Sequence, residues 1–140
     1  MKGMATLVRL AKFRLDEARR QLAELERLRE HLNKSLEKLA NELTQEQQAA
    51  GRSGEAFNGY AAYARAAMGR RATIEQSIAE LAPSLAEAEE AVTAAFQEMK
   101  RYELAEEHRQ RRTEEKRRRR EQTTLDETGL TRFQRARQVG

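Results

Sequence analysis

Apolar residues recur at intervals of three and four positions through most of the first 102 residues. In the first half, two rows spaced by seven are almost wholly apolar between Val8 and Leu43, and Arg29 is the charged interruption. An inward arginine of this kind can extend its head to water or fix the register of the seam. This heptad pattern predicts a helix over about residues 4–50 with a seam for a partner helix. The two rows are Val8, Leu15, Leu22, Arg29, Leu36 and Leu43, and Ala11, Ala18, Leu25, Leu32, Leu39 and Glu46.

A second pair of rows follows and keeps one phase to Tyr102, which predicts a second helix beginning at about residue 57. Pro83 falls inside it, away from the seam. Proline removes one helical hydrogen bond at a cost of about 3 kcal/mol, so we expect a kink there and not a break. The rows are Phe57, Ala64, Arg71, Ile78, Leu85, Val92 and Met99, and Tyr60, Ala67, Ile74, Leu81, Ala88, Ala95 and Tyr102.

The two patterns are separated by the only concentrated turn signal of the chain, with glycines at 51 and 54 and the pair Asn58-Gly59. Ser53 is a suitable N-cap for the second helix, and Asn58 is the competing start. Two seams joined by one short turn predict an all-α fold, an antiparallel two-helix coiled-coil hairpin. We expect a single coiled-coil domain over residues 1–140, with the tip at 51–56 and the second helix over about 57–126.

Composition supports long helices, since 36% of the residues are charged and only 5% are aromatic. The chain has no cysteine, which excludes disulfides and thiolate metal sites. It also has no signal-peptide core and no apolar run of the roughly 18–20 residues that would span a bilayer. We therefore expect a soluble cytoplasmic protein.

The second helix is expected to be the longer one and to carry a strongly basic segment beyond the reach of the first. About 25 residues, or roughly 35 Å, extend past the end of the first helix before a loose tail at 127–140. Between Lys100 and Arg120, ten Lys or Arg residues accompany five Glu, a local charge of +5 against +4 for the whole chain. We call residues 100–120 the basic segment. Helical ion pairs at i,i+4 are expected for Glu107 with Arg111, Glu114 with Arg118 and Glu115 with Arg119.

Four consecutive arginines surround a helix on all sides, so the basic segment has no apolar face with which to pack in its own chain. We therefore expect it to bind a protein partner that offers an acidic or carbonyl-lined socket. Phosphate binding is the weaker alternative, because no groove-reading fold is visible. The arginines concerned are Arg109, Arg111, Arg112, Arg117, Arg118, Arg119 and Arg120.

A second candidate surface lies at the expected tip, where aromatic residues stand among alanines and glycines. Phe57, Tyr60, Tyr63 and Ala64 form this tip cluster. Aromatic side chains at an exposed end are typical anchors at interfaces, although packing at the tip explains Phe57 and Tyr60 equally well. Catalysis is not indicated. His31 and His108 are far apart in sequence, and no metalloprotease, phosphate-loop or nucleophile motif occurs. We expect no enzyme activity, metal, cofactor or small-molecule substrate.

Three stretches together resemble the FliJ family of flagellar type III export proteins: "LVRLAKFRLDEARRQLAELE", "FNGYAAYA" and "KRYELAEEHRQRRTEEKRRRREQTTLDETGLTRF". The resemblance implies a non-catalytic cytoplasmic protein, associated peripherally with the export apparatus at the inner membrane. Its expected partners are the hexameric export ATPase, the membrane protein of the export gate and substrate chaperones. It would act as a rod-like stalk in the ATPase ring, with the basic segment toward the ring and the tip toward the gate.

The residues leave three other interpretations open. The chain could be a nucleic-acid-binding coiled coil, a generic coiled-coil adaptor, or the corresponding stalk protein of an injectisome. The first would bind DNA more tightly than the ~10⁻⁴–10⁻⁶ M typical of non-specific binding. The injectisome case has the same architecture, and the sequence does not separate it from the flagellar case.

Overall fold

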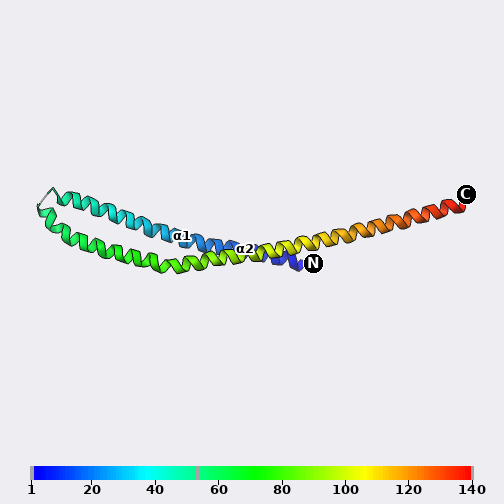
Figure 1. Cartoon of the computed structure of the whole chain (residues 1–140), viewed down its shortest axis with the longest axis horizontal. Coiled ribbons are helices and arrows are strands. Elements are labelled where there is room, and N and C mark those ends of the chain that lie inside the picture. The colour runs from blue at the N-terminus through cyan, green and yellow to red at the C-terminus, as the bar shows by residue number, and fades with distance from the viewer. Residues whose placement is uncertain (1, 53, 140) are drawn as a thin grey trace. The chain divides into compact units, whose positions relative to one another are not determined.

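The chain folds into two long helices. The computed structural model describes the backbone of residues 2–52 and 54–139, and the side chains of residues 3–52 and 59–138. Within this part of the chain the elements are α1 (Lys2–Ala50) and α2 (Gly54–Val139), with no strand (Figure 1). The prediction of an all-α fold is confirmed. None of the described helical stretches is long and apolar enough to cross a membrane.

The helices contribute to two packed units, which we describe separately. The hairpin unit is Phe13–Phe96, and the terminal unit combines Met1–Lys12 with Gln97–Gly140. In the hairpin unit, α1 ends where the Gly51 N–H donates to the Gln47 carbonyl oxygen at 3.2 Å and the Arg52 N–H donates to that of Ala49 at 3.1 Å. The chain then reverses, so that α1 and α2 run antiparallel, as predicted (Figure 1).

The turn is shorter than the sequence suggested. A tip over residues 51–56 was expected, but α2 already begins at Gly54, and Asn58 lies inside it. Glu55, Ala56 and the alanines after them are good helix formers, which favours an early start of the helix. The proposed N-cap, Ser53, lies outside the described residues.

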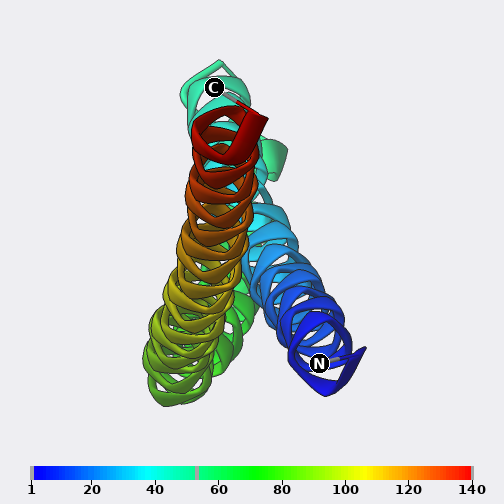
Figure 2. The ribbon, with the colours of Figure 1, turned by 90° about the vertical axis from the view of Figure 1, so that its right-hand side faces the viewer.

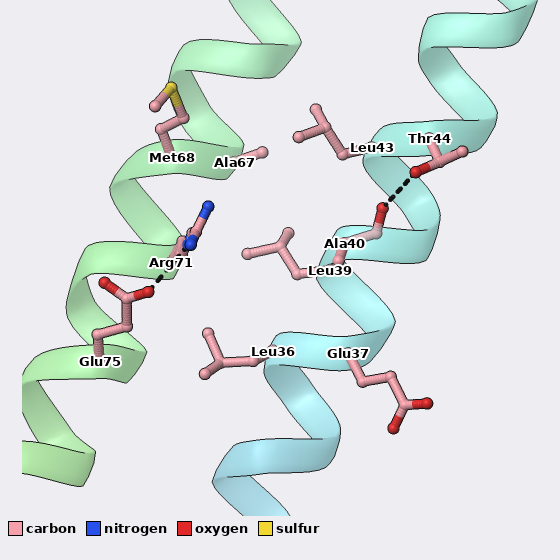
Figure 3. Close-up of a pocket in the computed structure, with 10 residues that line it drawn as sticks. All are labelled: Leu36, Glu37, Leu39, Ala40, Leu43, Thr44, Ala67, Met68, Arg71 and Glu75. Atoms are coloured by element: carbon pink, nitrogen blue, oxygen red, sulfur yellow. Dashed lines mark hydrogen bonds and ion pairs between the residues drawn. The ribbon is translucent and has the colours of Figure 1, made fainter.

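The buried side chains follow the predicted seams. Among the described side chains, all buried ones are apolar and lie on the two rows of their helix, with Ala50 extending the first row of α1 by one heptad beyond Leu43. The seam arginines Arg29 and Arg71 are exposed. Figure 3 shows Leu39 and Leu43 of α1 pointing toward the side of α2 that carries Ala67, whose small side chain lets the helices approach closely. The buried residues are Ala11, Leu15, Leu39, Ala50, Ala67, Leu81, Leu85 and Met99.

Pro83 lies within α2, and the helix continues on both sides of it. Its side chain is exposed, while Leu81 and Leu85 on either side are buried. The expectation that this proline does not end the helix is confirmed. The missing hydrogen bond therefore falls on the solvent side, where water can satisfy the free carbonyl group.

In the terminal unit, the first residues of α1 pack against the part of α2 that follows Gln97. Ala11 and Met99 are buried there, and Lys12 Nζ lies 3.8 Å from Glu103 Oε1. From Arg111 to Gln138 every side chain is exposed except that of Glu114, which is half-buried. In Figures 1 and 2 this part of α2, from yellow-orange to red, has no other segment of the terminal unit beside it.

The C-terminal end differs from expectation. A loose tail was predicted over residues 127–140, but α2 continues to Val139. The segment contains no proline, and Gln, Arg and Ala near its end have high helix propensity, so the helix can propagate from the preceding turns without a new nucleation step. The basic segment is therefore followed by about 19 further helical residues, roughly 28 Å at 1.5 Å per residue.

Candidate functional site

The basic segment begins where the apolar seam of α2 ends. After Met99 and Tyr102, the next two seam positions are held by Glu106 and Arg109. The Arg109 guanidinium donates to both carboxylate oxygens of Glu106, from Nη2 to Oε1 at 2.8 Å and from Nε to Oε2 at 3.0 Å. Of the described ion pairs in the basic segment, this two-bond pair is the least exposed to solvent, since the Glu106 side chain is 15% exposed.

The ion pair shifts both groups toward their charged forms. The hydrogen bonds from Arg109 lower the pKa of Glu106 below its ordinary value, against a smaller opposing effect of burial. The hydrogen bonds to Glu106 likewise raise the pKa of Arg109. Arg109 was expected among the partner-binding arginines. The structure gives it an intramolecular carboxylate, so its charge is already largely matched.

Further along the segment, two arginines share one glutamate. Arg117 Nη2 lies 2.9 Å from Glu114 Oε1, and Arg118 Nε lies 3.6 Å from the same oxygen. Arg117 Nε also lies 3.8 Å from Glu121 Oε1. The predicted pair of Glu114 with Arg118 is thus confirmed.

The other two predicted i,i+4 pairs, Glu107 with Arg111 and Glu115 with Arg119, do not appear among the described ion pairs. Pairs at i,i+3 occur instead, because the long arginine side chain reaches a carboxylate on either neighbouring turn.

Four cations remain on one side of the helix without a carboxylate partner among the described residues. Successive residues turn by about 100°, which places positions 112, 116, 119 and 120 within roughly a third of the circumference. We call Arg112, Lys116, Arg119 and Arg120 the basic stripe. All four are exposed, and Arg112 Nε donates only to the His108 carbonyl oxygen, at 3.5 Å. Arg111 and Arg118 lie about half a turn away from the stripe.

The basic stripe continues the face of α2 that carries the seam. Lys116 and Arg120 occupy seam positions, two heptads after Tyr102 and three after Met99. Arg112 lines a groove together with Gly3, Met4 and Leu7 of α1, and from Lys116 to Gln138 every described side chain of α2 is exposed. The unmatched positive charges of the basic stripe therefore lie on the same face of α2 that, earlier in the helix, packs against α1.

The tip cluster is only partly described. The side chain of Phe57 lies outside the described side chains. Tyr60, Tyr63 and Ala64 are half-buried and lie within about one turn of α2. Tyr60 and Ala64 occupy seam positions, so packing against α1 accounts for part of their burial.

Next to the tip cluster is a groove that the sequence did not single out. Leucines of α1 and Ala67, Met68 and Arg71 of α2 line it, and Met68 is 63% exposed (Figure 3). Arg71 turns aside to pair with Glu75 at 2.9 Å, so a seam position is left without an apolar side chain. The sequence feature that could have predicted this groove is Arg71, a charged residue within an otherwise apolar heptad row.

Neither histidine lies in an enclosed site. His31 and His108 are both exposed. No cluster of three or more His, Cys, Asp or Glu that could hold a metal ion occurs among the described residues.

Comparison of the sequence with models of known families gives a match over nearly the whole chain. The family model described as "Flagellar FliJ protein" matches residues 1–138. The chain belongs to the FliJ family. No curated protein and no solved structure gives a significant match. FliJ membership gives the chain a role related to flagellar protein export, and the FliJ family is a non-catalytic component of that system.

Proposed function

We propose that this FliJ-family protein acts as the central stalk of the flagellar export ATPase and links the ATPase to the export gate and to substrate chaperones. The basic segment contacts the hexameric ATPase ring, and the tip cluster contacts the gate. The protein works in the cytoplasm and is held at the inner membrane through these partners. It contributes no catalytic group, and acts by making different contacts with different subunits of the ring.

One observation carries this proposal. The basic stripe presents four cations, unmatched by carboxylates among the described residues, on the helix face that pairs with α1 elsewhere. Unmatched charge on an exposed helix has no stabilising role within the chain, because like charges repel. A partner with acidic side chains gains from it. The hexameric ATPase ring that the family resemblance implies has a central opening, which can receive this single helix and offer acidic side chains to the basic stripe.

The proposal is tested by binding of the full chain to the purified hexameric ATPase. Replacing Arg117, Arg118, Arg119 and Arg120 together by glutamine should weaken binding by about tenfold or more, since each charged contact contributes a few tenths to 1 kcal/mol. Binding of the unchanged protein should also weaken as the salt concentration rises.

A matched control removes the same charge elsewhere. Exposed arginines of the hairpin unit, replaced by glutamine, should leave ATPase binding within about twofold, since the proposal places no ring contact there. If the control loses as much affinity as the basic-segment variant, or if neither loses any, the basic segment is not the ring contact. The control residues are Arg19, Arg27, Arg65 and Arg70.

The tip cluster has a separate test. Phe57→Ala combined with Tyr60→Ala should impair binding to the gate protein and spare binding to the ATPase, because large aromatic side chains dominate interfaces of this kind. Equal loss of both activities would show instead that the two aromatic residues maintain the fold of the hairpin unit. Circular dichroism of the variant separates these cases.

A further inference from the structure

The terminal unit contains an apolar groove that lies directly beside the basic stripe. Gly3, Met4 and Leu7 of α1 form one wall, and Ala105, His108, Arg109 and Arg112 of α2 form the other. Met4 and Ala105 are half-buried, while Leu7 is 39% exposed. The groove is open to solvent, and the apolar side chains of its walls have too few neighbours to close it.

The groove and the stripe are continuous along α2. Arg112 belongs to both, and Lys116, Arg119 and Arg120 follow it over the next two turns, about 12 Å along the helix. The guanidinium of Arg109, at the same wall, is held by Glu106 and so adds little free charge. A partner on this surface therefore meets apolar side chains at one end and unmatched cations at the other.

We infer that this surface binds an amphipathic acidic helix of a partner protein, which packs on the seam face of α2 beside the first residues of α1 and continues along α2 past them. Two apolar side chains one turn apart fill the groove at Met4 and Leu7, and carboxylates over the next two turns pair with Arg112, Lys116 and Arg119. Both parts follow from the structure. The seam face is shaped to pack against a helix, and the charges on it require the opposite sign.

Other occupants fit less well. A bilayer would need the exposed apolar residues gathered on the side of the cations. At about 100° per residue, Leu125, Leu130 and Phe133 are spread over more than a third of the circumference, and of these three Leu130 alone lies on that side. Duplex DNA would satisfy the cations and leave the groove with Met4 and Leu7 empty. The inference rests on the proposed function in one respect: the protein that supplies the acidic helix is then the export ATPase.

The test uses the full chain and a synthetic four-turn peptide with a fluorescent label. The peptide carries two leucines one turn apart, followed by four glutamates on the same face, and a second peptide has lysine in place of each glutamate. We expect fluorescence anisotropy to show binding of the glutamate peptide alone. Arg112→Glu with Arg119→Glu should weaken this binding by about tenfold, because two attractive contacts become repulsive.

Matched variants on the opposite side of the helix make the test specific. Arg111→Glu with Arg118→Glu changes the same charge in the same turns and should alter the affinity by less than about twofold. Leu7→Asp should weaken binding, whereas Leu104→Asp, at an exposed leucine outside the groove, should not. All these side chains are exposed or lie at the rim, and circular dichroism confirms that each variant keeps its helices.

Several outcomes would overturn the inference. These are no binding of the glutamate peptide, equal binding of the lysine peptide, or equal losses from the two arginine pairs. Duplex DNA that displaces the peptide with higher affinity would assign the stripe to nucleic acid. Self-association that the stripe variants abolish would assign it to a second copy of this chain. Failure of the unchanged protein to bind the ATPase, with peptide binding intact, would refute the proposed function and leave the acidic-helix site in place.

Discussion

At the scale of single residues, the difference between seam and surface leucines has a measurable consequence. Leu85 is 5% exposed and Leu28 is 47% exposed. Leu85→Ala should lower the free energy of unfolding by about 2–3 kcal/mol, since it removes buried methyl groups from the apolar seam of the hairpin unit. Leu28→Ala should lower it by less than about 1 kcal/mol. Urea denaturation followed by circular dichroism measures both, and similar losses would contradict the assignment of the seam.

The ion pair of Glu106 and Arg109 predicts a dependence on pH. The pKa of Glu106 is lowered in the folded protein by hydrogen bonds from Arg109. Its contribution to stability is therefore present above the ordinary pKa of a glutamate and is lost as the pH falls through the lowered value.

Glu106→Gln should remove this part of the acid dependence, with Glu107→Gln, at an exposed neighbour, as the control. Thermal unfolding from neutral pH down to pH ~3 provides the measurement, since ordinary glutamates titrate near pH ~4.3. An unchanged pH profile in Glu106→Gln would show that the pair does not couple to folding.

At the scale of the elements, the sequence predicted what periodicity controls. Every buried residue among the described side chains lies on the two heptad rows or their extension to Ala50, because a seven-residue repeat places the same face of each helix toward its partner. Helix ends were predicted less well. The spacing of apolar residues indicates neither the early start of α2 at Gly54 nor its continuation to Val139. Both depend on helix propensity in segments with little packing.

The candidate site was predictable in its charge and not in its geometry. The excess of arginine after Lys100 is visible in the sequence, but which arginines are matched depends on side-chain rotamers. Arg109 and Arg117 pair three residues back, and Arg119 does not pair with Glu115 at all among the described residues. The groove at Met4 and Leu7 could not be predicted from the sequence, because it depends on how the first residues of α1 are aligned with residues 105–112 of α2. The pattern of either helix alone does not determine this alignment.

Pro83 gives a prediction for α2. Pro83→Ala restores an N–H that can donate to the Ala79 carbonyl oxygen and removes the clash of the ring with that turn. The exposed position tolerates alanine, so the free energy of unfolding should rise by about 1–3 kcal/mol. Ser84→Ala, at the exposed neighbouring position, is the control, and urea denaturation is the measurement. Equal or lower stability of Pro83→Ala would show that the hairpin unit is built around the proline.

At the scale of the whole molecule, the two units differ in the sign of their charge. Residues 13–96 contain eleven Lys or Arg and fourteen Asp or Glu, a charge of −3, whereas the remaining residues contain sixteen and nine, a charge of +7. The net charge of +4 thus conceals a strongly basic terminal unit. Acidic partners are therefore attracted to the terminal unit, and raised salt should weaken this attraction first.

The central claim is that the basic segment is the contact with the export ATPase, and hydrogen exchange of the backbone amides tests it most directly. In the free protein, amides of residues 111–138 should exchange rapidly, because this part of α2 has almost no tertiary packing. Addition of the hexameric ATPase should slow the exchange of residues 109–120 and leave residues 60–64 unchanged. Protection that appears at residues 60–64 while residues 109–120 continue to exchange rapidly would contradict the account.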